Sequence, residues 1–211
     1  MKSLHTARYL EALWPSQPVL ELGCGRGELL SVLQELGAEA TGVDNDPAMV
    51  AVARERGVRV LHADAVAHVR SLPPGSVGSV VAIQFLEHLG PAAVAELLEL
   101  SVSRLRPGGV FVAETPNPAS LIVLGNSYLL DPTRVQPPLH PALLTFLFES
   151  AGFSDVTLEF HSPAEEDRLR LVDDPEAPPW ADQVNQALAQ LNRVLFGPQD
   201  YSVVATRPPD G

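Results

Sequence analysis

Near the start of the chain, the segment VLELGCGRGELL places three glycines between two acidic residues. Gly23, Gly25 and Gly27 follow a short apolar segment that contains Glu21, and Glu28 comes directly after the last glycine. Glycines allow a tight turn and a close approach of the backbone to a ligand. A turn of this kind between a strand and a helix is typical of nucleotide-like ligand sites. The residues therefore predict a ligand site at this turn.

The spacing of the glycines indicates which ligand the turn favours. Dinucleotide sites have the fingerprint G-x-G-x-x-G, in which the third glycine lets the helix pack on the strand. Glu28 occupies that third place here. A pyrophosphate also favours a helix N-terminus without nearby carboxylates, but Glu21 and Glu28 flank this turn. The turn thus favours a cationic ligand without phosphates, and S-adenosylmethionine, with an ammonium and a sulfonium group, meets both conditions.

Two more carboxylates follow predicted strands. Asp44 ends the segment AEATGVD, and Asp64 ends VRVLHAD. A carboxylate in the first position can accept hydrogen bonds from both ribose hydroxyls, and one in the second position can accept a hydrogen bond from the adenine amino group. Open α/β sheets bind their ligands at the carboxyl ends of parallel strands. Asp44 and Asp64 are therefore predicted to lie at the same site as the glycine turn.

Strand and helix patterns alternate through the first half of the chain. This rhythm predicts an α/β fold with a doubly wound, mostly parallel sheet and right-handed crossovers. Predicted strands cover 19–22, 38–44, 58–64, 77–86 and 110–115, and predicted helices cover 28–36, 47–57 and about 14 residues from 91, stopped by the Pro-Gly-Gly at 107–109.

The composition excludes several classes of protein. With 45% hydrophobic and 19% charged residues, the 211 residues suit one globular domain. A formal net charge of −12, with 13 arginines and one lysine, argues against nucleic acid as a partner. No apolar run approaches the roughly 18 residues of a membrane span, and the first residues lack the pattern of a signal peptide. The single cysteine, Cys24, excludes an internal disulfide and predicts a reducing, cytoplasmic location.

Taken together, these segments resemble the class I S-adenosylmethionine-dependent methyltransferases. The segments VLELGCGRGELL, GVDNDPAMV, LHADA and VGSVVAIQFLEHL match that family's successive motifs in order and spacing, and LRPGGVFVAETPNP matches the approach to its fifth strand. The resemblance covers roughly residues 17–160. It implies a Rossmann-like sheet of seven strands whose last two form an antiparallel hairpin, which the segments VTLEF and YSVVAT would supply.

The resemblance also implies roles for individual residues. Glu21 and the glycine turn would hold the methionine end of the cofactor, Asp44 the ribose and Asp64 the adenine, with S-adenosylhomocysteine as the product. Three further residues are assigned to the same cofactor site: Asn45, Ala65 and Gln84.

Methyl transfer from a sulfonium is an in-line displacement, so the site must align the acceptor and help it to lose a proton. His88, at the end of the fourth predicted strand, is the first candidate base because an imidazole titrates near neutrality. In the wider family a Glu-His pair at this place often lies beside the acceptor, so Glu87 is expected to contact it. His140, which opens a predicted helix, is the second candidate base. His88 could equally begin the next helix and face solvent.

A narrower resemblance concerns the stretch after the fifth predicted strand. It is similar to methyltransferases encoded with bacterial surface-polysaccharide genes, including O-antigen chain-terminating enzymes. The shared features are a Pro-Asn-Pro, a Tyr, DPT, a Pro-rich turn and an HP that opens a helix ending ESAGF. Tyr128 could bind a sugar or stabilise a turn. Arg134 stands where that group has a histidine, and it could bind an anionic acceptor or pair with Asp131.

The second half of the chain breaks the strand and helix rhythm. Residues 161–179 hold six acidic residues against two arginines, which predicts a mobile surface loop. We interpret residues 1–211 as a single domain with acceptor-site insertions at 116–138 and 161–196. The remaining predicted elements are a helix at 140–152 and strands at 156–160 and 201–206.

The sequence favours O-methylation of a sugar, a glycan end or a small hydroxyl compound, with no metal site. Two alternatives remain at this point. A nicotinamide-dependent oxidoreductase would need the third glycine one place later, and a non-catalytic nucleoside-binding module could keep the same fold without the chemistry. The sequence leaves the oligomeric state open.

Overall fold

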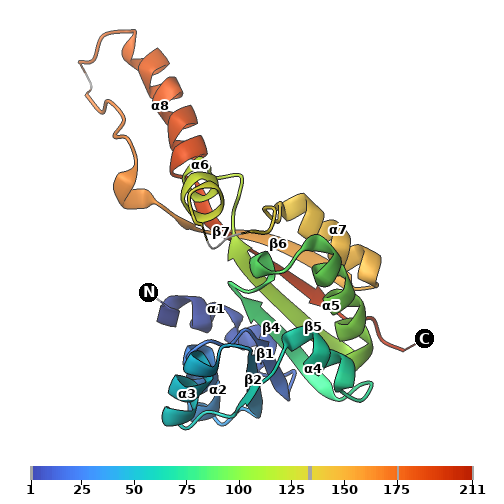
Figure 1. Ribbon diagram of the computed structural model, residues 1–211. Helices are drawn as coiled ribbons and strands as arrows, with labels where there is room; N and C mark the ends of the chain where they lie inside the picture. Colours follow the sequence, from blue (N-terminus) through green and yellow to red (C-terminus); the bar gives the residue numbers. More distant parts are fainter. Residues whose placement is uncertain (1, 133–134, 175, 211) are drawn as a thin grey trace.

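The centre of the molecule is a seven-stranded sheet with the strand order β3-β2-β1-β4-β5-β7-β6 (Figure 1). The computed structural model describes residues 2–132, 135–174 and 176–210, with side chains from residue 8 onward within these ranges. The strands are β1 (Val19–Leu22), β2 (Ala40–Asp44), β3 (Val60–His62), β4 (Val77–Ile83), β5 (Leu105–Pro116), β6 (Ser154–Pro163) and β7 (Pro198–Thr206).

The strand directions confirm the predicted fold class. Strands β1 to β5 pair in parallel, whereas β7 runs antiparallel to both β5 and β6. The chain moves outward from β1 to β3 on one side and then returns to place β4 on the other side of β1. This reversal of strand order leaves a crevice at the carboxyl ends of β1 and β4, which is the place where doubly wound sheets bind ligands.

Helices cover both faces of the sheet and give three layers (Figure 1). Helices α1, α2 and α3 pack on one face, and α4, α5 and α7 pack on the other. Among the described residues, no helix is both long and apolar enough to cross a bilayer. The bounds of these helices are α1 (Lys2–Leu13), α2 (Glu28–Glu35), α3 (Pro47–Glu55), α4 (Ala65–Ser71), α5 (Pro91–Arg104) and α7 (Pro141–Ala151).

Strand β5 is longer than the sequence pattern predicts. It begins at Leu105, so residues 107–109 lie in the strand and not in a turn. The pairing of β4 with β5 shifts register between Val77 and Ser79, and this irregularity accommodates the added proline and glycines. The Pro-Gly-Gly was interpreted as the end of the preceding helix, and α5 does end at Arg104, but the Pro-Gly-Gly lies at the bulged start of β5 and not before it.

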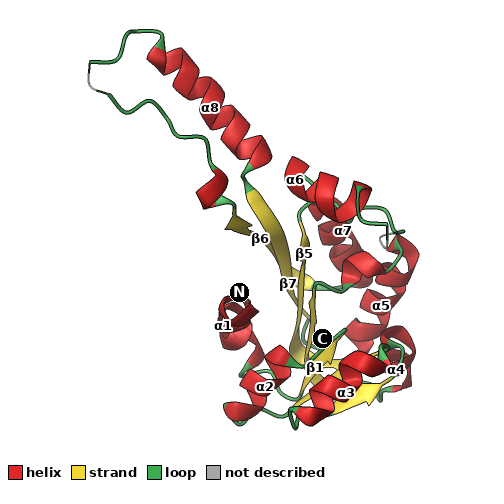
Figure 2. Cartoon of the chain, turned by 60° about the vertical axis from the view of Figure 1, so that its left-hand side comes forward, coloured by secondary structure: helices red, strands yellow, loops and turns green. Residues whose placement is uncertain are grey.

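The two segments predicted as insertions differ in shape. Residues 116–138 carry α6 (Leu121–Val123) and the π-helical turn η2 (Leu124–Leu129), which continue from the end of β5. Residues 161–196 carry the short helix η3 (Glu165–Asp167) and α8 (Ala181–Leu195), and they form an arm that extends away from the sheet (Figure 2).

Within this arm, two asparagine side chains of α8 form hydrogen bonds with the backbone of the acidic segment that was predicted to be a mobile loop. The Asn185 amide donates to the Val172 carbonyl oxygen at 2.9 Å and accepts from the Val172 N–H at 2.7 Å. Asn192 makes the same two bonds with Leu169, both at 2.8 Å. The two asparagines are seven residues apart and therefore lie on one face of the helix. The charge pattern of the segment does not predict this pairing.

Candidate functional site

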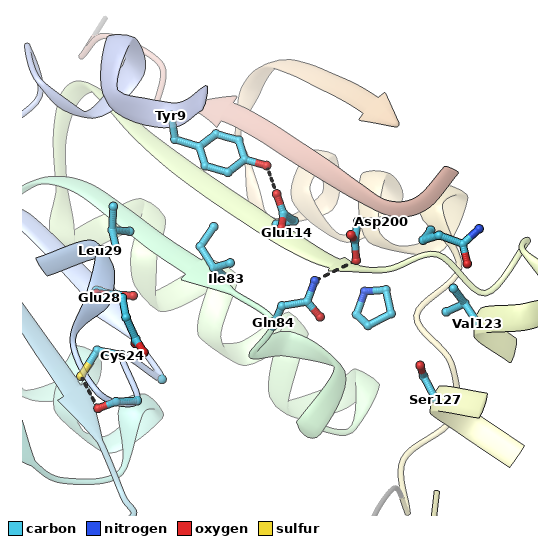
Figure 3. Close-up of a pocket in the computed structure, with 15 residues that line it drawn as sticks. Tyr9, Cys24, Glu28, Leu29, Ile83, Gln84, Glu114, Val123, Ser127 and Asp200 are labelled. Atoms are coloured by element: carbon cyan, nitrogen blue, oxygen red, sulfur yellow. Dashed lines mark hydrogen bonds between the residues drawn. The ribbon is translucent and has the colours of Figure 1, made fainter. Parts of the chain in front are cut away.

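Two cavities meet at the carboxyl edge of the sheet. The first has a volume of about 600 Å³ and the second about 420 Å³, and Gly23 and Gln84 line both. Figure 3 shows the first cavity, with the glycine turn at one end and residues of β5 and β7 at the other. The shared walls indicate that one ligand can extend from the second cavity into the first.

The glycine turn at this junction requires glycine. Gly23, Gly25 and Gly27 have φ angles of 65°, 53° and 74°, in the left-handed region that L side chains rarely adopt. A Cβ atom on Gly23 would lie 2.3 Å from Cδ2 of Phe85. The N–H of Gly23 donates to the Val43 carbonyl oxygen at 2.9 Å, which fixes the turn against β2. The conformation of the turn thus depends on its glycines and on its hydrogen bond to β2.

Asp44 is held in place by the same turn. Its Oδ2 accepts a hydrogen bond from the Gly25 N–H at 2.8 Å, and its Oδ1 accepts one from the Asp46 N–H at 2.8 Å. The carboxylate lines the second cavity. Since a carboxylate offers about four lone-pair positions, one that is fixed by two amides can still accept hydrogen bonds from two hydroxyls. This arrangement suits the ribose of a nucleoside.

The rest of the second cavity suits a flat, partly polar ring. Asp64 lines it and caps helix α4, with Oδ1 accepting from the Ala67 N–H at 2.8 Å. Asn45 and Ala65, both predicted for the cofactor site, line the cavity as well. Apolar and aromatic surface on the same walls comes from Met49, Ala63, Val66, Phe85 and Leu89.

At the glycine end of the first cavity, the lining is acidic. Glu21 is 6% exposed and lines the cavity together with Glu28. Glu28 pairs with Arg26, its Oε1 lying 3.0 Å from the arginine Nε. Carboxylates here favour an ammonium group and disfavour a pyrophosphate. The two joined cavities therefore fit a ligand with a nucleoside at one end and a cationic amino-acid group at the other, as S-adenosylmethionine has.

Cys24 also lines the first cavity, and its thiol is held protonated. Burial, with a further contribution from the Glu21 carboxylate, raises the pKa of Cys24 to about 12. The folded chain therefore keeps this proton at a pH where the unfolded thiol, with a pKa of roughly 8.5, loses it. It follows that the stabilising effect of this raised pKa is complete below about pH 8.5 and declines as the pH rises toward 12.

We expect Cys24 to react at pH 8 at least an order of magnitude more slowly in the folded protein than in denaturant, because both burial and the low thiolate fraction oppose the reaction. A thiol-reactive chromophore measures both rates. Equal rates in the two states would show that the thiol is exposed.

Gln84 lines both cavities and contacts Asp200 at the far end of the first cavity. It follows β4 with a φ of 52°, a conformation that costs a non-glycine residue energy and occurs often at functional sites. Its N–H donates to the Glu114 carbonyl oxygen at 2.7 Å. Its side-chain Nε2 donates to Oδ1 of Asp200 at 3.0 Å (Figure 3). The predicted cofactor residue thus also contacts the end of the cavity that is available to an acceptor.

Several residues of this end were not predicted from the sequence. Tyr9 of α1 donates a short hydrogen bond to Oε2 of Glu114 (Figure 3), and Nη1 of Arg8 lies 3.3 Å from the same oxygen. Burial, and then the charge of Glu114, raises the pKa of Tyr9 above its usual value, so the phenol remains a donor. The polar residues of this end are Glu114, Ser127, Gln199 and Asp200.

The rule that predicted Asp44 and Asp64 from the ends of parallel strands could also have identified Glu114. Glu114 lies near the carboxyl end of a parallel strand, as Asp44 and Asp64 do. Asp200 comes from β7, which runs antiparallel, so the start of that strand lies at the site. Tyr9 comes from a helix, and no spacing rule applied to the sequence connects it with the site.

The two candidate histidines lie outside the first cavity. His88 is exposed and lines the second cavity, beside the residues that suit a nucleoside. His140 is exposed and caps helix α7, where its Nδ1 accepts from the Ala142 N–H at 3.2 Å. It lines neither cavity. The structure therefore gives His140 a structural contact at the position predicted for a base.

Two of the three residues predicted to bind the acceptor, Glu87 and Tyr128, lie behind the cavity wall. Glu87 is 1% exposed and accepts a hydrogen bond from the Thr115 hydroxyl at 3.1 Å. Tyr128 is 7% exposed, and its hydroxyl donates to the Pro116 carbonyl oxygen at 3.2 Å. Both side chains support the end of β5 and do not line the cavity. Arg134 lies outside the described residues.

The two insertions relate differently to the site. Residues Val123 and Ser127 of the first insertion line the first cavity. None of the described residues of 161–174 and 176–196 lines either cavity, so the structure does not place this part of the arm at the acceptor site. Across the part of the chain that the structure describes, no group of three or more His, Cys, Asp or Glu side chains could hold a metal ion.

Comparison with known proteins agrees with this geometry. A family model described as a methyltransferase domain matches residues 19–109. A probable S-adenosylmethionine-dependent methyltransferase of Mycolicibacterium smegmatis is 38% identical over 137 residues, covering 64% of this chain. The ubiquinone biosynthesis O-methyltransferase of Xanthomonas campestris is 36% identical over 124 residues, covering 54% of this chain. The chain spans about half (51%) of the length of each of these two relatives.

A solved structure matches over nearly the whole chain. The crystal structure of an S-adenosylmethionine-dependent methyltransferase from Archaeoglobus fulgidus is 36% identical, with a TM-score of 0.86, and the match covers 98% of this chain and 94% of that one. The glycine turn, the acidic residues at the strand ends and this similarity agree on one family. The chain belongs to the class I S-adenosylmethionine-dependent methyltransferases.

Proposed function

We propose that the protein transfers the methyl group of S-adenosylmethionine to a hydroxyl oxygen of a sugar, a glycan end or a related small molecule. The observation that carries this proposal is the lining of the first cavity beyond the glycine turn. Two carboxylates, two amides and one hydroxyl face a space that continues from the cofactor end: Glu114, Asp200, Gln84, Gln199 and Ser127. Side chains of these types accept and donate hydrogen bonds to neighbouring hydroxyl groups.

In this proposal, the residues of the glycine turn and the strand ends hold the cofactor. Glu21 binds the methionine ammonium, Asp44 the ribose hydroxyls and Asp64 the adenine amino group. Asn45 and Ala65 complete the nucleoside pocket, and Gln84 lies where the two cavities join. The cofactor supplies a methyl group on a sulfonium, so the protein's main contribution is to align an acceptor in the first cavity.

We assign supporting roles to the predicted residues that do not line the first cavity. His88 borders the nucleoside pocket, so we place it beside the cofactor. Glu87 and Tyr128 position the acceptor wall through Thr115 and Pro116, to which they are hydrogen-bonded.

The choice of a hydroxyl acceptor has support from two similarities. The first is the resemblance of residues 116–152 to methyltransferases of bacterial surface-polysaccharide gene clusters, and this segment supplies Val123 and Ser127 to the cavity. The second is the name of the Xanthomonas relative, which is an O-methyltransferase.

The test is a product assay with defined acceptors. The protein is incubated with S-adenosylmethionine and separate panels of free monosaccharides, nucleotide-linked sugars, phenols and simple amines, and S-adenosylhomocysteine formation is followed. We expect turnover with members of the hydroxyl panels, and mass spectrometry should locate the added methyl on oxygen. Turnover with amines alone would overturn the proposal.

A further inference from the structure

Asp200 and Gln84 form a contact that spans strand β5. Gln84 follows β4 and Asp200 lies near the start of β7, and β5 separates these two strands in the sheet. The Cα partner of Asp200 on β5 is Pro116. The 3.0 Å hydrogen bond from Gln84 to Asp200 therefore passes across β5, and both residues line the first cavity (Figure 3).

This contact places a carboxylate next to the junction of the two cavities. Gln84 lines both cavities, so a side chain bonded to Gln84 lies beside the passage between the cofactor and the acceptor. The donor amide also orients one oxygen of the carboxylate. Because the φ of Gln84 is 52°, the backbone bears strain to aim this side chain, as is common for residues that position reacting groups.

We propose that Asp200 is the catalytic general base and that Gln84 is its positioning residue. This inference rests on the proposed hydroxyl acceptor. The acceptor oxygen forms a bond to the methyl carbon while the carbon–sulfur bond breaks, and that electron pair stays on sulfur to give neutral S-adenosylhomocysteine. The hydroxyl proton passes to the Asp200 carboxylate, which later releases it to water.

Other groups at the site are less suited to this task. Glu114 lines the same cavity, but it is 1% exposed and is bonded to Tyr9 and Arg8. Both of these contacts are made to Oε2 of Glu114. His88 lines only the second cavity, and His140 lines neither. Asp200 is half-buried and lines the first cavity. It accepts a hydrogen bond from Gln84, the residue that lies where the two cavities join.

The placement of Asp200 can be tested without knowing the acceptor. Sinefungin is an analogue of S-adenosylmethionine in which a carbon bearing an amine replaces the methylated sulfur. Its ammonium group therefore occupies the region from which the methyl group leaves. We expect the wild-type protein to bind sinefungin roughly tenfold or more tightly than S-adenosylhomocysteine, because a charged hydrogen bond to Asp200 adds to the affinity.

Calorimetry on three variants then isolates Asp200. In Asp200→Asn the preference for sinefungin should disappear, with S-adenosylhomocysteine affinity within about twofold of wild type, whereas Asp200→Glu should retain a preference. Glu159→Gln is the matched control, because Glu159 lies on the neighbouring strand β6, is 56% exposed and lines neither cavity. That variant should keep the full preference.

The outcomes separate this inference from the proposed function. An unchanged preference in Asp200→Asn, or no preference in the wild type, would overturn the placement of Asp200. If Asp200→Asn does not bind S-adenosylhomocysteine, the sinefungin preference of Asp200→Glu is compared with that of the wild type instead. Loss of the sinefungin preference in Asp200→Glu would count against the inference. Methylation of amines alone would overturn the hydroxyl acceptor and leave the sinefungin result standing.

Discussion

Replacing Gly23 by alanine should weaken S-adenosylhomocysteine binding by roughly tenfold or more and lower the free energy of unfolding by about 2–5 kcal/mol. Two effects add in this variant. The φ of 65° disfavours any L side chain, and the new Cβ would lie 2.3 Å from Cδ2 of Phe85. Because Phe85 also lines the second cavity, relief of this clash moves a wall of the proposed nucleoside pocket.

A matched control separates the clash from the backbone strain. Gly75 has a φ of 63°, and a Cβ there would have no neighbouring atom within 4 Å. Gly75→Ala should therefore cost about 1–2 kcal/mol of stability and leave ligand affinity unchanged. Chemical denaturation and calorimetry measure the two quantities. If Gly23→Ala and Gly75→Ala behaved alike, the close packing of the glycine turn against Phe85 would have no part in binding.

Replacing Asp44 by alanine should weaken the binding of S-adenosylhomocysteine by about 1.5–3 kcal/mol, which is roughly 10- to 150-fold. The variant loses the carboxylate proposed to bind the ribose. It also leaves the N–H groups of Gly25 and Asp46 without their acceptor, which loosens the turn on which the methionine end depends. Calorimetry measures the affinity directly.

Two further variants show which of these effects dominates. Asp44→Asn keeps the shape and one acceptor oxygen, so it should bind more tightly than the alanine variant and more weakly than wild type. Glu96→Ala removes an exposed carboxylate that pairs with Arg70 and lines neither cavity, so it should bind as wild type does. Wild-type affinity in Asp44→Ala would contradict the ribose assignment.

The sequence predicted the parts of the site that follow from chain direction and spacing. Asp44 and Asp64 were predicted because the carboxyl ends of parallel strands meet at one edge of a sheet, and both line the second cavity. Glu21 and the glycines were predicted because the glycine spacing differs from the dinucleotide fingerprint and the flanking carboxylates disfavour a pyrophosphate. Each of these inferences depends on local sequence, and local sequence determines where a strand ends.

The acceptor end could not be predicted in the same way because distant segments form it. Asp200 reaches the site only because β7 inserts antiparallel between β5 and β6. Tyr9 reaches it because α1 packs against the sheet beside β5. His140 was chosen for its chemistry, but as the first residue before a helix it caps that helix, a role that its position would also have suggested.

A calorimetric titration of the purified protein with S-adenosylmethionine, S-adenosylhomocysteine and the two nicotinamide dinucleotides tests which ligand the joined cavities bind. Glu21, Asp44 and Asp64 line joined cavities that suit a cationic nucleoside without phosphates. We predict that both sulfur nucleosides bind in the micromolar range and that neither dinucleotide does. Binding of a dinucleotide alone, or of none of the four ligands, would contradict the assignment of this site.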